Sequence, residues 1–404
     1  MGSAAQPAKD SWTAVLVLGI TQIIAWGSIY YLFALLMEPL QVTLGATNNA
    51  IVGAFSLALL LSGALSPLVG SVIDRHGGRV VMAAGSLLGS LSLCALAYVT
   101  NLFELYAVWA LLGVSMAATL YEPAFAVLTQ AFKANFRKAI TALSLFGGFA
   151  STIFWPITAV LIERYGWRNA VLMLGVTNLL VCVPLHLFAL PRHRATSTHT
   201  HSTRAMSRSM HDALHDRKFY LLCAAFTANA IVFSAMSVHM LAMLNDQGLT
   251  SVQAALIGAL VGPMQVAGRV VELFFGRLVS PSKVGFIAMG LLPLSLALFL
   301  VAGSTLALLA LFALLYGSGN GVMTIVRGTI PAELYGRANY GAINGAMALP
   351  VLVSKSLGPL AASFLLVGLG GYGGVIDALI AIAASSVFFF YLATRPKAES
   401  RAAI

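Results

Sequence analysis

Two oppositely charged side chains, Arg269 and Glu272, lie in an otherwise apolar stretch of this chain. An ionised group inside a membrane costs about 2.5 kcal/mol or more unless it is paired or faces water. The guanidinium of Arg269 is a permanent cation, and its planar set of N–H donors fits a carboxylate. Because Glu272 follows by three residues on the same helical face, the two side chains could instead form an ion pair that only supports packing. The sequence leaves both roles open for Arg269, anion binding and structural pairing.

A second cation, Lys355, lies between Pro350 and Pro359 in another apolar stretch. A lysine in such a place either faces a polar cavity or extends its long side chain to the membrane surface. The position of Lys355, about halfway along the stretch, favours the cavity. If Lys355 faces Arg269, the two cations form a pocket that suits an anion.

Aromatic and amide side chains gather in the first apolar stretch, at Gln22, Trp26, Tyr30 and Tyr31. Tyrosine hydroxyls and an indole edge can orient a small anion in an otherwise apolar cavity. For Trp26 and Tyr31, the alternative is a place in the aromatic belt at the membrane surface. A single neutral polar residue in a membrane helix more often joins helices than binds a ligand. The further neutral candidates for substrate contact are Thr152, Asn229, His239 and Gln265.

Glu122 and Arg327 occupy nearly equivalent places toward the ends of two further apolar stretches. Opposite charges at related places predict an ion pair that closes an inner gate. Alternatively, a desolvated Glu122 could bind and carry a proton. A carboxylate held only by nearby backbone N–H groups is the structural alternative.

The elements that must hold these side chains are membrane-spanning helices. Hydrophobic residues make up 59% and charged residues 9% of the 404 residues, with a mean hydropathy of +0.90, which excludes a water-soluble domain. A helix needs about 20 apolar residues to span a bilayer, whereas barrel strands have about 10. The sequence predicts twelve helical spans, at 12–36, 48–72, 79–99, 104–129, 138–163, 168–190, 218–243, 251–276, 281–302, 304–330, 338–366 and 370–393.

Basic residues predict the orientation of these spans, since Lys and Arg in short loops stay on the cytoplasmic side. With the amino terminus inside, every Lys and Arg in loops or at span ends falls inside, except Arg164 and Arg168. We therefore expect both termini to be cytoplasmic, and we expect a bacterial inner membrane because the loops are short. The first span lacks a small-residue cleavage site and should be retained. The net charge of +10 reflects this topology and attraction to anionic lipid, so no nucleic-acid partner is expected.

One polar segment, 191–217, divides the chain and is rich in Ser, Thr, His and Arg. It predicts an amino-terminal six-helix bundle over 1–190, a cytoplasmic linker over 191–217 and a carboxyl-terminal six-helix bundle over 218–404. The histidines of the linker lack the carboxylate or thiol cluster that would complete a metal site. We expect no metal, no cofactor and no disulfide framework. The three cysteines all lie in predicted spans: Cys94, Cys182 and Cys223.

The two halves resemble one another about 204 residues apart, an internal repeat typical of transporters. Lys133-Ala134-Asn135-Phe136 corresponds to Arg337-Ala338-Asn339-Tyr340, and the turn Gly166-Trp167 corresponds to Gly371-Tyr372. The predicted fold is an all-α membrane protein of two pseudo-symmetric six-helix bundles. Such a pair can rock about a site between the bundles and open it to one side at a time.

A charged loop between the second and third spans carries a family resemblance. Gly70-Ser71-Val72-Ile73-Asp74-Arg75-His76-Gly77-Gly78-Arg79 resembles the signature loop of the major facilitator superfamily, with one additional Gly before Arg79. The resemblance implies the major facilitator fold over essentially the whole chain. Asp74 can accept hydrogen bonds from a helix amino terminus, and Arg75 and Arg79 can pair with cytoplasmic acids. We expect these contacts to form and break between two conformations; a plain basic loop that sets topology is the alternative.

The eighth span resembles that of the monocarboxylate and oxalate/formate transporter branch of this superfamily. There, an Arg at the place of Arg269 holds the substrate carboxylate. In many monocarboxylate members, an Asp four residues earlier takes part in proton coupling, whereas this chain has Gln265 at that place. The second cation of the oxalate transporter corresponds to a place near Met347, two turns before Lys355. The aromatic first span resembles the same branch.

These features predict a secondary active transporter that works by alternating access, since no Walker loop offers ATP coupling. The first expectation is proton-coupled transport of a small, monocarboxylate-like organic anion by a monomer. Proton-antiport efflux of a drug or amphipathic metabolite, with Glu122 as the proton site, is the alternative. A receptor that binds without transporting is a third, less favoured class. An enzyme is not expected, because the sequence offers no constellation of nucleophile and base.

Overall fold

The computed structural model describes residues 12–132, 135–191 and 209–395, and all regular structure within them is helical. Most of the predicted linker lies outside these residues, as do Lys133-Ala134 of the predicted repeat and the basic residues nearest both termini. Eleven stretches of the described residues are long and apolar enough to cross a membrane. Their outer bounds agree with the predicted spans to within about five residues, except that the first stretch continues to Leu44, beyond the predicted end at residue 36.

One of these stretches, Phe136–Ala189, is 54 residues long and accounts for two predicted spans. A straight helix of that length would be far longer than the roughly 30 Å hydrocarbon core. The chain turns at Gly166, whose φ of 77° and ψ of 156° lie outside the helical region. Glycine adopts this positive φ without the steric cost of a Cβ atom. Spans 138–163 and 168–190 therefore lie on either side of Gly166, and the twelve-helix prediction is confirmed.

The chain forms two compact units, and the first comprises Met1–Arg208 together with Pro331–Leu349. The predicted amino-terminal bundle, 1–190, is thus accompanied by a segment from the carboxyl-terminal half. The helices of this unit are α1 (Trp12–Ala25), α2 (Leu32–Leu44), α3 (Asn48–His76), α4 (Gly78–Leu96), α5 (Leu102–Thr119), α6 (Tyr121–Ala131), α7 (Phe136–Gly148) and α8 (Ala150–Thr177). Three π-helical segments complete them: η1 (Trp26–Tyr31), η2 (Asn178–Cys182) and η3 (Leu185–Ala189).

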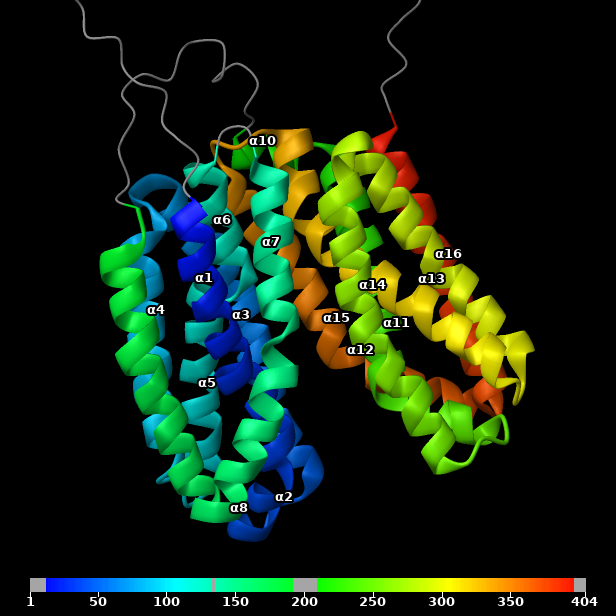
Figure 1. Ribbon diagram of the computed structural model, residues 1–404, viewed down its shortest axis with the longest axis horizontal. Helices are drawn as coiled ribbons and strands as arrows, with labels where there is room; N and C mark the ends of the chain where they lie inside the picture. The colour runs from blue at the N-terminus through cyan, green and yellow to red at the C-terminus, as the bar shows by residue number, and fades with distance from the viewer. Residues whose placement is uncertain (1–11, 133–134, 192–208, 396–404) are drawn as a thin grey trace, which may run out of the picture. The chain divides into compact units, whose positions relative to one another are not determined.

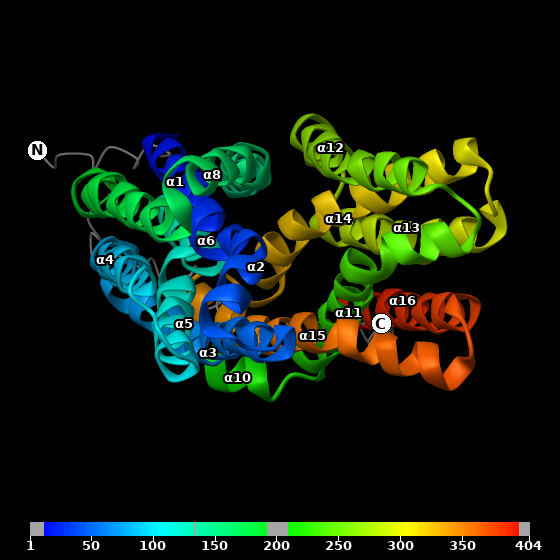
Figure 2. The ribbon, with the colours of Figure 1, turned by 90° about the horizontal axis from the view of Figure 1, so that it is seen from below.

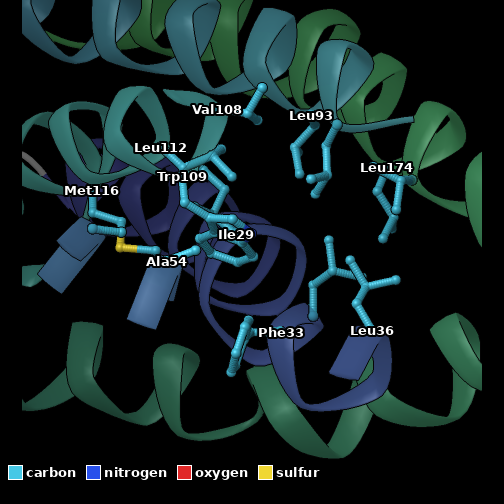
Figure 3. Packing of buried hydrophobic residues seen from close by; sticks show 14 of the residues in the cluster. Ile29, Phe33, Leu36, Ala54, Leu93, Val108, Trp109, Leu112, Met116 and Leu174 are labelled. Carbon is cyan, nitrogen blue, oxygen red and sulfur yellow. The ribbon is translucent and has the colours of Figure 1, made fainter. Parts of the chain in front are cut away.

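The helices of the first unit pack side by side. Figures 1 and 2 show α3 and α4 running along α5, and α1 lying beside α7. Three aromatic rings pack together in the core. Phe33 stacks on Phe55 with ring centroids 4.4 Å apart, and Trp109 packs edge to face against each of them. Figure 3 shows Phe33 and Trp109 among the surrounding aliphatic side chains of the core, including Leu36. Edge-to-face pairs are the favoured arrangement of aromatic rings.

The second unit comprises Ser209–Ile330 and Pro350–Ile404. Its core contains Phe299, Phe312 and Tyr316, which pack ring against ring. A capping box at Thr250 and Gln253 begins the second long helix of this unit. The helices that lie wholly or mostly in this unit are α10 (Met210–Leu214), α11 (Arg217–Asp246), α12 (Ser251–Phe275), α13 (Pro281–Ala302), α14 (Leu306–Tyr335), α15 (Tyr340–Leu369) and α16 (Tyr372–Thr394), with a short 3-10 turn, η4 (Gly276–Leu278).

Candidate functional site

An aromatic cluster forms around the π-helical segment η1 of the first unit. Its members are Trp26, Tyr30 and Tyr31 of η1 together with Tyr121, the first residue of α6. The ring centroid of Trp26 lies 4.9 Å from that of Tyr30, 6.0 Å from that of Tyr31 and 5.0 Å from that of Tyr121. All four side chains are partly exposed. The structure therefore brings together the three aromatic candidates of the first span and adds Tyr121, which the sequence analysis did not single out. π-Helical segments occur frequently at functional sites.

The fourth span is broken next to this cluster. Leu120, between α5 and α6, has an extended backbone with φ −80° and ψ −154°. The Gln22 side chain of α1 donates from Nε2 to the carbonyl oxygens of Thr119, at 2.6 Å, and Leu120, at 3.3 Å. The same amide accepts a hydrogen bond from Trp26 Nε1 at 3.0 Å. Gln22 is completely buried and joins the broken helix to the aromatic cluster.

A buried histidine that the sequence analysis did not single out connects η3 to α1 and α4. His186 of η3 is completely buried, with Nε2 at 2.9 Å from the Thr21 hydroxyl and Nδ1 at 2.8 Å from the Ser86 hydroxyl. The Thr21 hydroxyl also donates to the carbonyl oxygen of Leu18, at 3.1 Å. An ionisable residue inside a span was itself a signal, since such residues mark functional or structural sites.

The signature loop meets the start of α15 within the first unit. The Asp74 carboxylate accepts hydrogen bonds from the backbone N–H groups of Gly341, at 3.0 Å, and Ala342, at 2.9 Å. These are among the N–H groups that a helix leaves unpaired at its amino end, where a negative charge is favourable. The backbones come so close that a Cβ atom on Gly70 would meet the carbonyl of Gly341. This close approach explains the glycine at position 70. The proposed role of Asp74 in switching between conformations stays a prediction.

The two arginines of the signature loop have different surroundings. Arg79 donates from Nε to the carbonyl oxygen of Leu187 in η3, so its contact is a backbone group, whereas the sequence analysis expected an acid. Arg75 is exposed at the end of α3. Arg337, the counterpart of Lys133 in the repeat, donates to the carbonyl oxygen of Phe132 at 3.0 Å.

Arg269 and Glu272 are both buried in the second unit, with exposed fractions of 5% and 6%. Arg269 Nε lies 3.3 Å from the carbonyl oxygen of Gly321 on α14. Helices α12 and α14 lie so close together there that a Cβ atom on Gly321 would clash with the backbone of Gln265. The guanidinium is therefore held against the backbone of the neighbouring helix, next to a carboxylic acid on its own helix.

Lys355 lies at a proline-distorted part of α15 in the same unit. Pro359 has no N–H group, so the Lys355 carbonyl lacks its usual donor four residues later. The Ser234 hydroxyl of α11 donates to this carbonyl instead. One turn further along, His239 Nε2 lies 3.1 Å from the carbonyl oxygen of Pro359. Ser234 and His239 thus join α11 to two successive turns of α15.

The remaining candidates are spread over both units. Glu122 and Arg327 are each half-buried, as are Asn229 and Gln265, whereas Thr152 is exposed. In the first unit, the candidates of α1 and η1 lie together. In the second unit, Arg269 of α12 contacts α14, and His239 of α11 contacts α15. Within the described residues, no three His, Cys, Asp or Glu side chains form a group that could hold a metal ion.

Comparison with known proteins identifies the family. The sequence profile of the Major Facilitator Superfamily matches residues 16–282. The chain is 29% identical to monocarboxylate transporter 13 of Rattus norvegicus over 280 residues, which cover 67% of this chain and 63% of that protein. It is 26% identical to monocarboxylate transporter 12 of Xenopus laevis over 343 residues, which cover 74% of this chain and 73% of that protein. The match to the first of these relatives thus spans under two thirds of its length.

A solved structure supports the same assignment of the fold. The Major Facilitator Superfamily transporter FucP of E. coli superimposes with a TM-score of 0.73 over 95% of this chain and 99% of FucP, at 13% sequence identity. The relatives agree with the branch that the eighth span resembles. Together, the profile match, the twelve apolar helices and this superposition show that the chain is a multi-pass membrane protein that belongs to the Major Facilitator Superfamily, a family of transporters and not of enzymes.

Proposed function

We propose that this protein is a secondary active transporter that moves a small organic anion of the monocarboxylate type together with a proton. The observation that carries the proposal is Arg269, a permanent cation that is 5% exposed in an apolar membrane helix. Keeping such a cation inside a membrane is costly, and a carboxylate ligand offsets the cost in a way that fits the planar guanidinium. The relatives named monocarboxylate transporters support the same substrate class.

Further residues take proposed roles in contacting the anion. Lys355 would add positive charge for the anion, and Trp26, Tyr30 and Tyr31 would contact its apolar part. Asn229, His239, Gln265 and Thr152 are the neutral candidates for contact. Glu272, on the same helical face as Arg269, is the carboxylic acid that we propose for the proton, because Gln265 cannot titrate.

The proposed conformational cycle uses charges nearer the ends of the spans. We propose that Glu122 and Arg327 act in gating, and that Asp74, Arg75 and Arg79 stabilise one of two conformations. We further propose a monomer with two six-helix halves on either side of a linker at 191–217. We also propose that both termini are cytoplasmic, which the positions of the basic residues support. The proposed membrane is a bacterial inner membrane.

Uptake into proteoliposomes tests the proposal. With an inward proton gradient, we expect saturable uptake of at least one of acetate, L-lactate and benzoate, and a protonophore should abolish accumulation. Arg269→Gln should abolish uptake in folded protein, whereas Arg164→Gln, at an exposed arginine of α8, should not. Glu272→Gln should retain exchange of labelled for unlabelled anion but lose proton-driven accumulation. Full uptake by folded Arg269→Gln protein would exclude the proposed substrate site.

A further inference from the structure

The fourth span contains a carbonyl group that its own helix cannot satisfy. Pro123, in the first turn of α6, has no N–H group, so the carbonyl of Thr119, four residues earlier, has no donor in the regular helical pattern. In a membrane, a backbone group of this kind must find a partner within the protein. The partner is Gln22 Nε2, at 2.6 Å from the Thr119 oxygen.

The other end of the same amide is also occupied. Gln22 Oε1 accepts the indole N–H of Trp26 at 3.0 Å, one turn further along the first span. Gln22 is completely buried, and with its oxygen bonded to Trp26 and its nitrogen bonded to the broken helix, the orientation of the amide is fixed. The side chain is thus engaged with protein groups at both ends.

The contacts of Trp26 extend this link across the break. Its ring centroid lies 5.0 Å from that of Tyr121, the first residue of α6. Gln22 in turn donates to the carbonyl oxygen of Thr119, the last residue of α5. The carbonyl of Leu120, between them, also lies within 3.3 Å of Gln22 Nε2. One glutamine therefore contacts both the carbonyl groups at the break and the Trp26 indole.

We infer that Gln22 is a positioning residue: anchored to the broken fourth span, it acts on the substrate through Trp26 alone, without contacting the substrate itself. The inference rests on the proposed function, in which Trp26 belongs to the substrate site, and it revises the role of Gln22 from ligand to support. A positioning residue changes affinity only through the residue that it orients. Loss of Gln22 and loss of the Trp26 indole should therefore affect transport in a non-additive way.

The first test measures the Trp26 environment and needs no substrate. The difference between the fluorescence emission of the wild type and that of Trp26→Phe isolates the Trp26 signal. Gln22→Met, which keeps the length of the side chain and removes its hydrogen bonds, should shift that signal. Gln247→Met is the matched control, because Gln247 makes a comparable amide hydrogen bond to the carbonyl of Phe299 in the other unit. It should leave the Trp26 signal unchanged.

The second test measures uptake of whichever of acetate, L-lactate and benzoate the wild type transports fastest. We expect Gln22→Met to raise the KM about fivefold with little change in Vmax. In the double variant with Trp26→Phe, the KM should rise no further than in Trp26→Phe alone. If Gln22→Met does not fold, Gln22→Asn replaces it, since its amide is one methylene too short to reach both partners.

The outcomes separate this inference from the proposed function. An unchanged Trp26 signal in folded Gln22→Met protein would overturn the inference, as would additive effects of the two substitutions on KM. Uptake of none of the three anions by the wild type would overturn the proposed function, while the fluorescence comparison would still decide whether Gln22 orients Trp26.

Discussion

Asp74 and Ala342 lie 268 positions apart in the sequence, yet the Asp74 carboxylate accepts the backbone N–H of Ala342 at 2.9 Å. Together with the N–H of Gly341, this contact places a negative charge at the amino end of α15. The glycines at positions 70 and 341 allow the two backbones to come close enough for it. The signature loop is therefore a structural partner of α15 in this conformation.

Replacement of Asp74 by Asn should destabilise the protein. The amide has one acceptor oxygen where the carboxylate has two, and its NH₂ group would face a backbone N–H. Loss of a charged cap of this kind costs about 1–2 kcal/mol. We expect the detergent-purified variant to have a lower apparent melting temperature, measured from the loss of the circular dichroism signal on heating. Asp246→Asn, at the exposed end of α11, is the control and should melt like the wild type. Equal melting of the two variants would show that the Asp74 contacts do not stabilise the fold.

The contact between His186 and Thr21 predicts a non-additive pair of substitutions. Thr21→Val leaves His186 Nε2 without this hydrogen-bond partner in a completely buried place and should cost about 1–2 kcal/mol. His186→Leu removes the ring and leaves two hydroxyls to find other partners. Combining the two should cost less than the sum, because both partners of the hydrogen bond are removed together. Thermal unfolding of the four proteins in the same detergent measures this coupling.

The control for this cycle is Thr177→Val. The partly exposed Thr177 hydroxyl donates to the carbonyl oxygen of Met173 in its own helix, so its loss should be nearly neutral. Strictly additive effects of Thr21→Val and His186→Leu would mean that the hydrogen bond between them contributes nothing.

The lengths of the apolar stretches and the residues between them predict the spans of this protein. The hydrogen-bond partners of its polar residues, in contrast, are set by the tertiary fold. The length of an apolar stretch and the glycine at position 166 were sufficient to place the helices and the turn between the fifth and sixth spans. In contrast, Gln22 finds its carbonyl partner 97 residues away, and His186 finds Thr21 165 residues away. No periodicity in one sequence encodes such pairings. The sequence analysis selected Gln22 as a candidate for substrate contact, but the sequence alone did not reveal that its amide bonds to the carbonyl groups of a broken helix.

Prolines inside the spans indicate backbone carbonyl groups without a helical donor, and the sequence analysis did not use this signal. Pro123 and Pro359 each remove the donor of a carbonyl four residues earlier, at Thr119 and Lys355. In both cases a polar side chain of a neighbouring helix, Gln22 or Ser234, supplies the missing donor. A proline inside a span thus predicts a nearby donor, although it does not predict which helix carries that donor.

The pairing of Ser234 with Pro359 leads to a third prediction. In the wild type, Ser234→Ala removes the donor to the Lys355 carbonyl. We expect a loss of about 1 kcal/mol in the free energy of unfolding, seen as a lower apparent melting temperature. Pro359→Ala restores an N–H at position 359, which can donate to the same carbonyl as in a regular helix. Ser234→Ala should therefore have little effect in a Pro359→Ala background. Ser237→Ala is the control in both backgrounds, because the Ser237 hydroxyl donates within its own helix, to Ser234. An equal loss from Ser234→Ala in both backgrounds would show that the serine does not replace the donor that proline removes.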